Sequence, residues 1–148
     1  MYKVGFGSVY GDFWLGNDLL HKVTSTTPHE LLIHLYLITN REVFARYERF
    51  MIANEQERYR LTFGKLKEGS DLLRNLNNTM FYTLDNHLPG VCTENPHQAN
   101  GFWISLSTKE CKEFNPNEHN DGLYWWSETE HNYFLITKVI FMVRQEER

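Results

Sequence analysis

The sequence has no concentrated positive charge and no long apolar run. Its formal net charge is -4, with 15 Lys and Arg against 19 Asp and Glu. Polyanion binding needs clustered Lys and Arg, so the composition argues against a nucleic-acid partner. No stretch of 18 apolar residues occurs, which argues against a membrane-spanning helix. The amino terminus, "MYKVGFGSVYGDFWLG", lacks a basic patch followed by an apolar stretch, so we expect no signal peptide in this chain.

Cysteine is also scarce, because Cys92 and Cys111 are the only two in the sequence. Two thiols suffice for one disulfide in an oxidising compartment, but not for a fold built on disulfides. A structural zinc site would need two more good ligands. Aromatic residues are abundant at 15%, which favours a sheet-rich core or an aromatic binding surface. The 148 residues fit one domain.

Local patterns predict one short helix and several strands. "LGNDLLHKVTS" predicts a helix capped by Asn17. Residues 30–38 and 42–50 predict a β-hairpin whose turn contains Asn40, and the apolar residues on both faces of 30–38 predict cover on each side. A third strand is expected in 57–64.

The carboxyl-terminal half has one strong strand signal, the β-branched and aromatic run at 133–143. Residues 65–78 are polar and loop-like, with a possible helical turn from Asp71 to Leu76. Between 85 and 132 no periodicity persists, and a loop region of this length inside a domain is usually functional. This order of elements predicts an α+β domain.

Three segments resemble the fibrinogen C-terminal (fibrinogen-related) domain family. They are "GFGSVYGDFWLGNDLLHKVTS", "ARYERFMIANEQERYRLTFGKL" and "DLLRNLNNTMFYTLD". The resemblance is nearly continuous over about 2–85 and patchy afterwards. It implies a central antiparallel sheet with short helices and a long loop-rich ligand region. We therefore expect a single domain, 1–148, with a central subdomain at about 1–84, a ligand and calcium subdomain at about 85–132, and a returning strand at 133–143.

The resemblance implies a secreted, non-enzymatic recognition module. Its ligand would be a protein receptor or partner chain, or an acetylated glycan, bound through residues 92–126. Family members carry a further amino-terminal subdomain that this sequence lacks, so a truncated or degenerate domain without ligand binding is an alternative. A hydrolase is a further alternative, because Cys111 with His119, or Ser105 with His119 and Asp121, could be written as a nucleophile and base. The resemblance also implies that Cys92 and Cys111 pair.

The family holds calcium in a loop that corresponds to "TLDNHLPGVC". Asp85 occupies its first ligand position, and His87 replaces a second aspartate. Imidazole is a poor ligand for a hard cation, so we expect a turn capped by Asp85 and Asn86 in place of a calcium site. Calcium at Asp85 and His87 remains an alternative, as does a transition metal at His87 with His97 or His119.

The ligand pocket of the family lies beside this loop, and its walls are aromatic. By position, the resemblance assigns six candidate ligand-binding residues to this chain: Phe102, Trp103, Glu110, His119, Tyr124 and Trp125. Each ring could instead fill the core, so both roles stay open. Separately, "NNT" forms an N-glycosylation sequon at Asn77.

Overall fold

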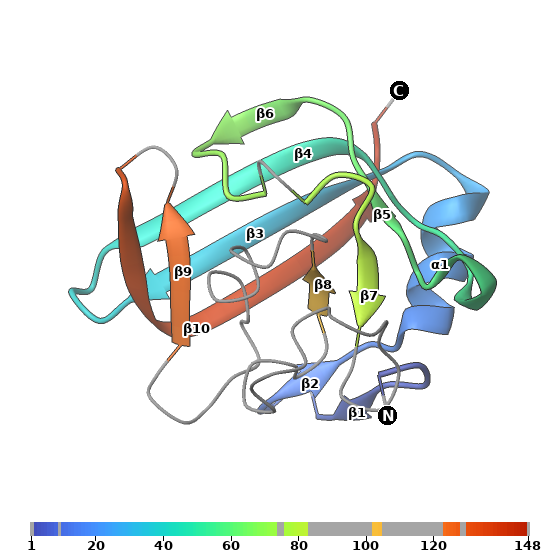
Figure 1. Ribbon diagram of the computed structural model, residues 1–148, viewed down its shortest axis with the longest axis horizontal. Coiled ribbons are helices and arrows are strands. Elements are labelled where there is room, and N and C mark those ends of the chain that lie inside the picture. The colour runs from blue at the N-terminus through green and yellow to red at the C-terminus, as the bar shows by residue number, and fades with distance from the viewer. Residues whose placement is uncertain are drawn as a thin grey trace.

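The computed structural model describes residues 2–8, 10–73, 76–82, 102–104, 123–127 and 130–147 (Figure 1). For Tyr82, Phe102, Trp103, Ile104, Leu123, Tyr124, Trp126 and Tyr133, the description covers the backbone alone. Within these residues, no helix has the length and apolarity needed to cross a membrane.

The largest sheet in the described part of the chain has six strands and an antiparallel order of β5-β4-β3-β10-β9, with β6 paired to β4. Figure 1 shows the long strands of this sheet lying side by side, with α1 at one end. The strands of the sheet are β3 (His29–Leu37), β4 (Glu42–Ile52), β5 (Leu61–Thr62), β6 (Leu66–Gly69), β9 (Leu123–Ser127) and β10 (Asn132–Gln145).

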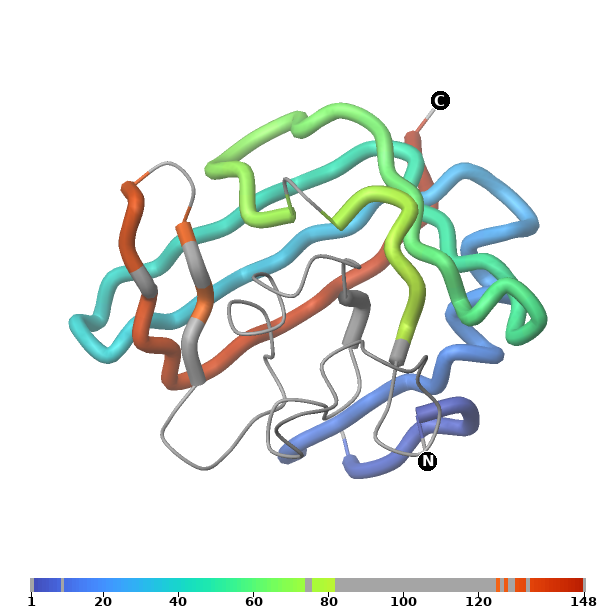
Figure 2. Tube along the Cα trace, viewed as in Figure 1, coloured from blue at the N-terminus to red at the C-terminus, as the bar shows by residue number. Residues whose placement is uncertain are grey.

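Within the described residues, two small antiparallel ladders accompany the main sheet. The first pairs β1 (Phe6–Gly7) with β2 (Phe13–Trp14), and the second pairs β7 (Met80–Tyr82) with β8 (Phe102–Ile104). The tube in Figure 2 follows residues 76–82 past the sheet toward the end where β1 and β2 lie. The expected α+β architecture is confirmed by the sheets and the short helices.

The predicted β-hairpin is confirmed, with β3 and β4 as its arms. Leu35 opposes Val43, and the Leu37 backbone N–H donates to the Arg41 carbonyl at 2.8 Å. Asn40 adopts a left-handed conformation with φ 66°, which asparagine tolerates better than most residues. The strand predicted at 133–143 is also confirmed, since β10 pairs with β3 along most of its length.

The two faces of the hairpin differ in burial. Side chains on the inner face, including Leu31, Ile33 and Leu35 of β3, are buried in the main core. The opposite face carries Phe44 and Met142, which are 41% and 45% exposed. The expectation that both faces are covered is therefore wrong for this face. An apolar composition does not by itself show that a face of the sheet is buried, because half-exposed apolar side chains are normal on protein surfaces.

Helix α1 (Asn17–Thr26) occupies the predicted place, but its cap differs from the prediction. Gly16 is the N-cap residue, with φ 105°, and a Cβ there would lie 2.7 Å from the Val4 carbonyl carbon. Asn17 lies inside the helix instead, where its Oδ1 accepts a hydrogen bond from Trp14 Nε1. Thr24 joins the helix to the sheet, because its Oγ1 accepts from the Ile52 N–H at 3.0 Å.

Two further expectations are wrong in the middle of the chain. The strand predicted at 57–64 is reduced to β5, because Arg58 and Tyr59 adopt positive φ after the 3-10 helix η1 (Glu55–Glu57). The polar stretch expected to be a loop contains β6, whose Glu68 opposes Arg46 of β4. An exposed edge strand can be polar on both faces, so it has no apolar alternation to reveal it.

Candidate functional site

The candidate site is the part of the domain carried by β7, β8 and β9, since these strands flank the segments expected to bind a ligand. In the β7–β8 ladder, Tyr82 opposes Phe102 and Phe81 opposes Trp103. The chain therefore leaves the ladder after Tyr82 and re-enters it beside that residue at Phe102. The predicted calcium and glycan-binding residues lie in or next to the segments that these strands delimit.

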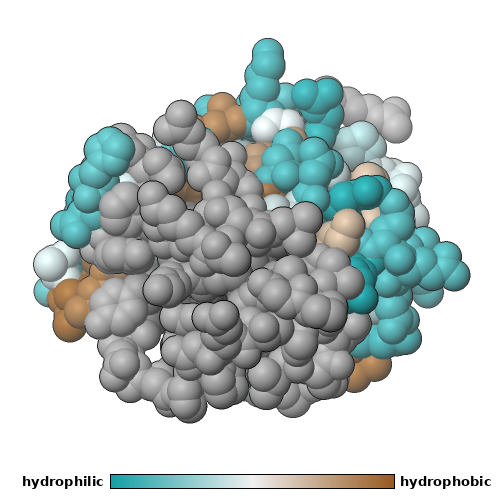
Figure 3. All heavy atoms as spheres, viewed as in Figure 1, coloured by the Kyte–Doolittle hydropathy of each residue, from teal (hydrophilic) through white to brown (hydrophobic). Residues whose placement is uncertain are grey.

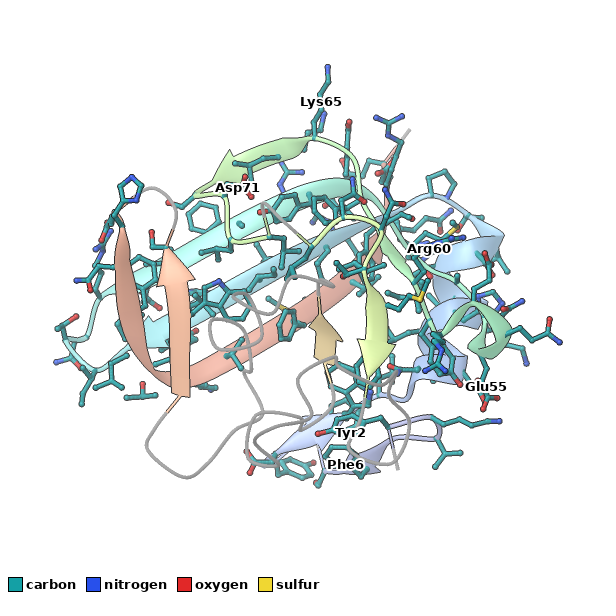
Figure 4. All side chains as sticks on the ribbon, in the orientation of Figure 1. Tyr2, Phe6, Glu55, Arg60, Lys65 and Asp71 are labelled. Atoms are coloured by element: carbon teal, nitrogen blue, oxygen red, sulfur yellow. The ribbon has the colours of Figure 1, made fainter. Side chains whose placement is uncertain are left out.

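Phe81 fixes this ladder to the amino-terminal segment. Its side chain is buried, and its ring centroid lies 5.3 Å from that of Tyr2 and 5.9 Å from that of Trp14. Tyr2 also packs edge-on against Phe6 at 5.2 Å, and Figure 4 shows these two side chains next to each other. The Phe81 backbone N–H donates to the Arg58 carbonyl at 2.8 Å. Such aromatic pairs add stability beyond the area they bury.

Polar contacts tie α1 to η1 and to Tyr59, which follows η1, at the same end of the molecule. The Tyr59 hydroxyl donates to Asp18 Oδ1 at 2.7 Å, and burial together with the Asp18 carboxylate raises the pKa of this phenol. Lys3 forms ion pairs with Glu55 and Asp18. On the face seen in Figure 3, the described surface on the side of α1 and η1 is mainly hydrophilic.

Tyr47 anchors the segment that leads to β7. Its hydroxyl donates to Asp71 Oδ1 at 2.5 Å and accepts from the backbone N–H groups of Leu72 and Leu73, at 2.8 and 3.0 Å. Burial raises the pKa of the phenol far above its usual range, and the Asp71 carboxylate raises it further. The hydroxyl therefore stays protonated and donates to Asp71 at all physiological pH values.

Trp125 anchors β9 to the same segment. Its side chain has no exposed area, its indole Nε1 donates to the Leu72 carbonyl at 3.1 Å, and its ring lies 6.3 Å from that of Phe141. The sequence left two roles open for this residue, a pocket wall or a core side chain. The structure places the Trp125 ring in the core.

The other predicted ligand-binding residues divide into two groups. Phe102 and Trp103 lie on β8 and Tyr124 lies on β9, where the description covers their backbone pairing. Glu110 and His119 lie outside the described residues, as do the proposed metal ligands Asp85 and His87 and the cysteines Cys92 and Cys111. Among the residues that the structure describes, no three His, Cys, Asp or Glu side chains gather closely enough to hold a metal ion.

Asn77, the predicted glycosylation site, lies on the surface in the turn before β7. Its side-chain amide forms two hydrogen bonds with the backbone of Phe63. Neither this structural role nor the anchoring roles of Tyr47 and Trp125 were predicted from the sequence. A signal for Tyr47 existed, because a tyrosine on the inner face of a strand needs a buried partner for its hydroxyl.

The arrangement is an antiparallel α+β globe in which short strands on a buried scaffold flank long connecting segments. Residues 1–143 match the family described as fibrinogen beta and gamma chains, C-terminal globular domain. The chain belongs to this family, and the resemblance stated from the sequence is confirmed.

Relatives and solved structures agree with this assignment. The chain is 33% identical over 156 residues to angiopoietin-related protein 7 of Bos taurus, covering 99% of this chain and 44% of that protein. It is 37% identical over 127 residues to ryncolin-4 of Cerberus rynchops, covering 83% of this chain and 34% of that protein. The chain thus spans less than half of the length of these curated relatives.

The fold is similar to that of solved fibrinogen-like globes. The human ANGPTL6 globe gives a TM-score of 0.78 at 26% identity, covering 99% of this chain and 70% of that chain. The fold is also similar to that of a lamprey fibrin D-dimer complexed with the peptide Gly-His-Arg-Pro-amide, with a TM-score of 0.73 at 20% identity over 96% of this chain and 54% of that chain.

Proposed function

We propose that this chain is a non-enzymatic, extracellular recognition module that binds a protein partner through the region carried by β7, β8 and β9. Family membership over 1–143 supports a recognition role, because domains of this family generally bind ligands and do not catalyse reactions. The same membership supports secretion.

The structural observation that carries the proposal is the convergence of two anchors on residues 71–73. Tyr47 of β4 and Trp125 of β9 both form buried hydrogen bonds with the backbone of this segment. β4, β9 and the segment that leads to β7 are thus joined in the same core. Recognition domains commonly place binding residues on connections that a rigid scaffold positions.

A peptide or protein ligand is supported by the lamprey fibrin structure, which has the same fold and holds a short peptide. The aromatic residues of β8 and β9 favour a second ligand class. Phe102, Trp103 and Tyr124 could contact the apolar face of an acetylated glycan, with Glu110 and His119 supplying polar contacts. Calcium is not required in this proposal, because the family resemblance places His87 where a second aspartate would bind the ion.

Binding measurements with defined probes separate these ligand classes. Immobilised chain should be tested by biolayer interferometry against a panel of receptor ectodomains and the Gly-His-Arg-Pro-amide peptide, and on an array of acetylated glycans with and without EDTA. Saturable binding to a protein or to the peptide, reduced by His119→Ala, is the expected result. Acetyl-specific glycan binding would replace the protein partner with a lectin function.

A control variant keeps this test specific. Phe44 lies on the exposed face of the main sheet, away from β7 and β8, so Phe44→Ala should leave binding unchanged. Equal loss of binding in Phe44→Ala and His119→Ala would show that the region carried by β7, β8 and β9 is not the binding surface. Absence of binding to every probe would favour the alternative that this chain is a truncated or degenerate domain without ligand binding.

A further inference from the structure

The outer edge of β5 continues into the turn that contains the glycosylation sequon. The Leu61 backbone N–H donates to the Thr79 carbonyl at 2.8 Å, and the Leu61 carbonyl accepts from the Asn78 N–H at 2.8 Å. On its other edge, β5 pairs with β4. Phe63 lies two residues beyond Leu61, so its own N–H and carbonyl face the same side as those of Leu61.

The side chain of Asn77 satisfies both backbone groups of Phe63. The Phe63 N–H donates to Asn77 Oδ1 at 3.1 Å, and Asn77 Nδ2 donates to the Phe63 carbonyl at 3.1 Å. The backbone of Leu61 pairs with the backbone of residues 78–79. At Phe63, the side-chain amide of Asn77 takes the place of such a backbone partner. The Phe63 ring packs on Tyr47 at 4.9 Å, which connects this bridge to the Tyr47–Asp71 anchor.

The geometry of these two hydrogen bonds decides which hydrogen of Asn77 Nδ2 is donated to the Phe63 carbonyl. One hydrogen lies on the Oδ1 side of the amide and the other on the Cβ side. The N–H and carbonyl of a single residue lie close together, so Oδ1 and Nδ2 can reach both only through the hydrogen on the Oδ1 side. The bridge between Asn77 and Phe63 therefore depends on that hydrogen.

An N-linked glycan would replace the same hydrogen. Transfer from a lipid-diphosphate oligosaccharide forms a bond from Nδ2 to the anomeric carbon of the sugar, and the lipid diphosphate leaves as Nδ2 loses one proton. A secondary amide prefers the trans form, which places the sugar carbon on the Oδ1 side. The alternative cis form costs free energy. In the trans form the glycan removes the hydrogen that the bridge needs, and in the cis form the amide is strained. The native bridge and an unstrained glycan therefore cannot coexist at Asn77.

The threonine hydroxyl of the sequon also forms a hydrogen bond within the fold. Thr79 is buried at 8% exposure, and its Oγ1 donates to the Leu76 carbonyl at 2.6 Å. A folded chain therefore does not present the sequon as an accessible acceptor, and any glycan would have to be attached before folding.

We propose that Asn77 is a structural bridge and that its glycosylation and the native pairing with Phe63 exclude each other. The folded chain is consequently unmodified at Asn77, even after passage through a glycosylating compartment. A glycan attached before folding diverts the chain from the native state. This inference concerns folding and does not depend on the proposed ligand-binding function.

Expression with an added signal sequence in a glycosylating host tests the proposal. Intact mass before and after peptide N-glycosidase treatment gives the occupancy of the monomeric, secreted fraction. We expect no glycan at Asn77 in that fraction. Full occupancy in monomer that melts at the temperature of the unglycosylated chain would overturn the proposal.

A matched control shows whether the host can modify this chain. Asn40 lies in the exposed β3–β4 turn, and Glu42→Thr places a sequon there. In the double variant Glu42→Thr with Asn77→Gln, the secreted fraction should carry a glycan at Asn40. The comparison distinguishes exclusion at Asn77 from poor glycosylation of the whole chain.

Variants made in a non-glycosylating host test the bridge directly. Asn77→Asp keeps an acceptor for the Phe63 N–H but places a second oxygen against the Phe63 carbonyl, so its melting temperature should fall by about 3 °C. Asn78→Asp, at the adjacent exposed position, should change it by less than about 1 °C. Equal changes in melting temperature for Asn77→Asp and Asn78→Asp would contradict the bridge. So would rapid hydrogen exchange of the Phe63 amide in the unaltered chain, a measurement that needs no variant.

Discussion

The indole Nε1 of Trp125 donates to the backbone carbonyl of Leu72 at 3.1 Å, although 53 residues separate the two in the sequence. This hydrogen bond joins β9 to the segment that precedes β7. The indole N–H and the Leu72 carbonyl are both buried, so each is satisfied by the other and not by water.

Trp125→Phe should destabilise the domain by about 1–3 kcal/mol, because the Leu72 carbonyl loses its donor while the core keeps an aromatic ring. Urea unfolding followed by circular dichroism measures the change. Trp14→Phe is a useful comparison, since Trp14 donates to Asn17 Oδ1 from a half-buried position. A free energy of unfolding unchanged in Trp125→Phe would show that water replaces the indole at Leu72.

Tyr47→Phe should lower the free energy of unfolding by about 2 kcal/mol, because one deletion leaves the Asp71 carboxylate and two backbone N–H groups without the hydroxyl. Combining it with Asp71→Asn should give less than the sum of the single effects, since the residues share one network. Tyr36→Phe, on the exposed face of β3, is the control. Additive effects would mean that Tyr47 and Asp71 act independently.

Acid should weaken the Glu30 ion pairs on the sheet. Burial alone would raise the pKa of this carboxyl, but hydrogen bonds from Arg144 and Arg46 outweigh burial and hold the pKa below its ordinary value of 4.5. The pairs therefore contribute fully above about pH 4.5, and their contribution is lost as the pH falls through the lowered pKa.

Glu30→Gln removes this titration. The variant should melt a few degrees below the unaltered chain at pH 7, and the difference should shrink toward pH 3 in a series of thermal melts. Glu130→Gln removes an exposed pair with Arg41 and should have little effect at either pH. A difference that grows on acidification would contradict the role assigned to Glu30.

Millimolar calcium should leave the melting temperature within about 1 °C of its value in EDTA, because a ligand stabilises a protein only when the folded state binds it. This expectation rests on the family resemblance, in which His87 stands where a second aspartate would bind calcium, so one carboxylate ligand would be missing. Asp85→Asn serves as the matched control and should behave identically with and without calcium. A rise of several degrees, abolished by Asp85→Asn, would show that the folded chain binds calcium through Asp85.

Several elements could be predicted because their signals are local. Asn40 tolerates the left-handed conformation that the β3–β4 turn requires, and the β-branched run at 133–143 favours the strand that became most of β10. The helix was found from its apolar positions, but its cap was misplaced by one residue. Gly16 has no side chain to mark it as a cap, whereas Asn17 carries one that instead accepts from Trp14.

Other features required partners that lie far away in the sequence. β6 is polar and exposed, so only its pairing with β4 makes it a strand. Phe102, Trp103, Tyr124 and Trp125 looked equivalent as aromatic residues. The position of Trp125 beside Leu72 and Phe141 placed its side chain in the core, because burial depends on packing neighbours and not on residue type.

The sequence by itself determined the family, the α+β class, the hairpin and the last strand, since motifs, turn residues and apolar alternation act over a few neighbouring positions. Tertiary structure alone decided that Asn77, read as an acceptor for a glycan, is bonded to the backbone of Phe63. It also decided that Tyr47 and Trp125 anchor residues 71–73. A polar group takes its role from the donor or acceptor that folding places opposite it, and that partner is set by the sheet topology of the whole domain.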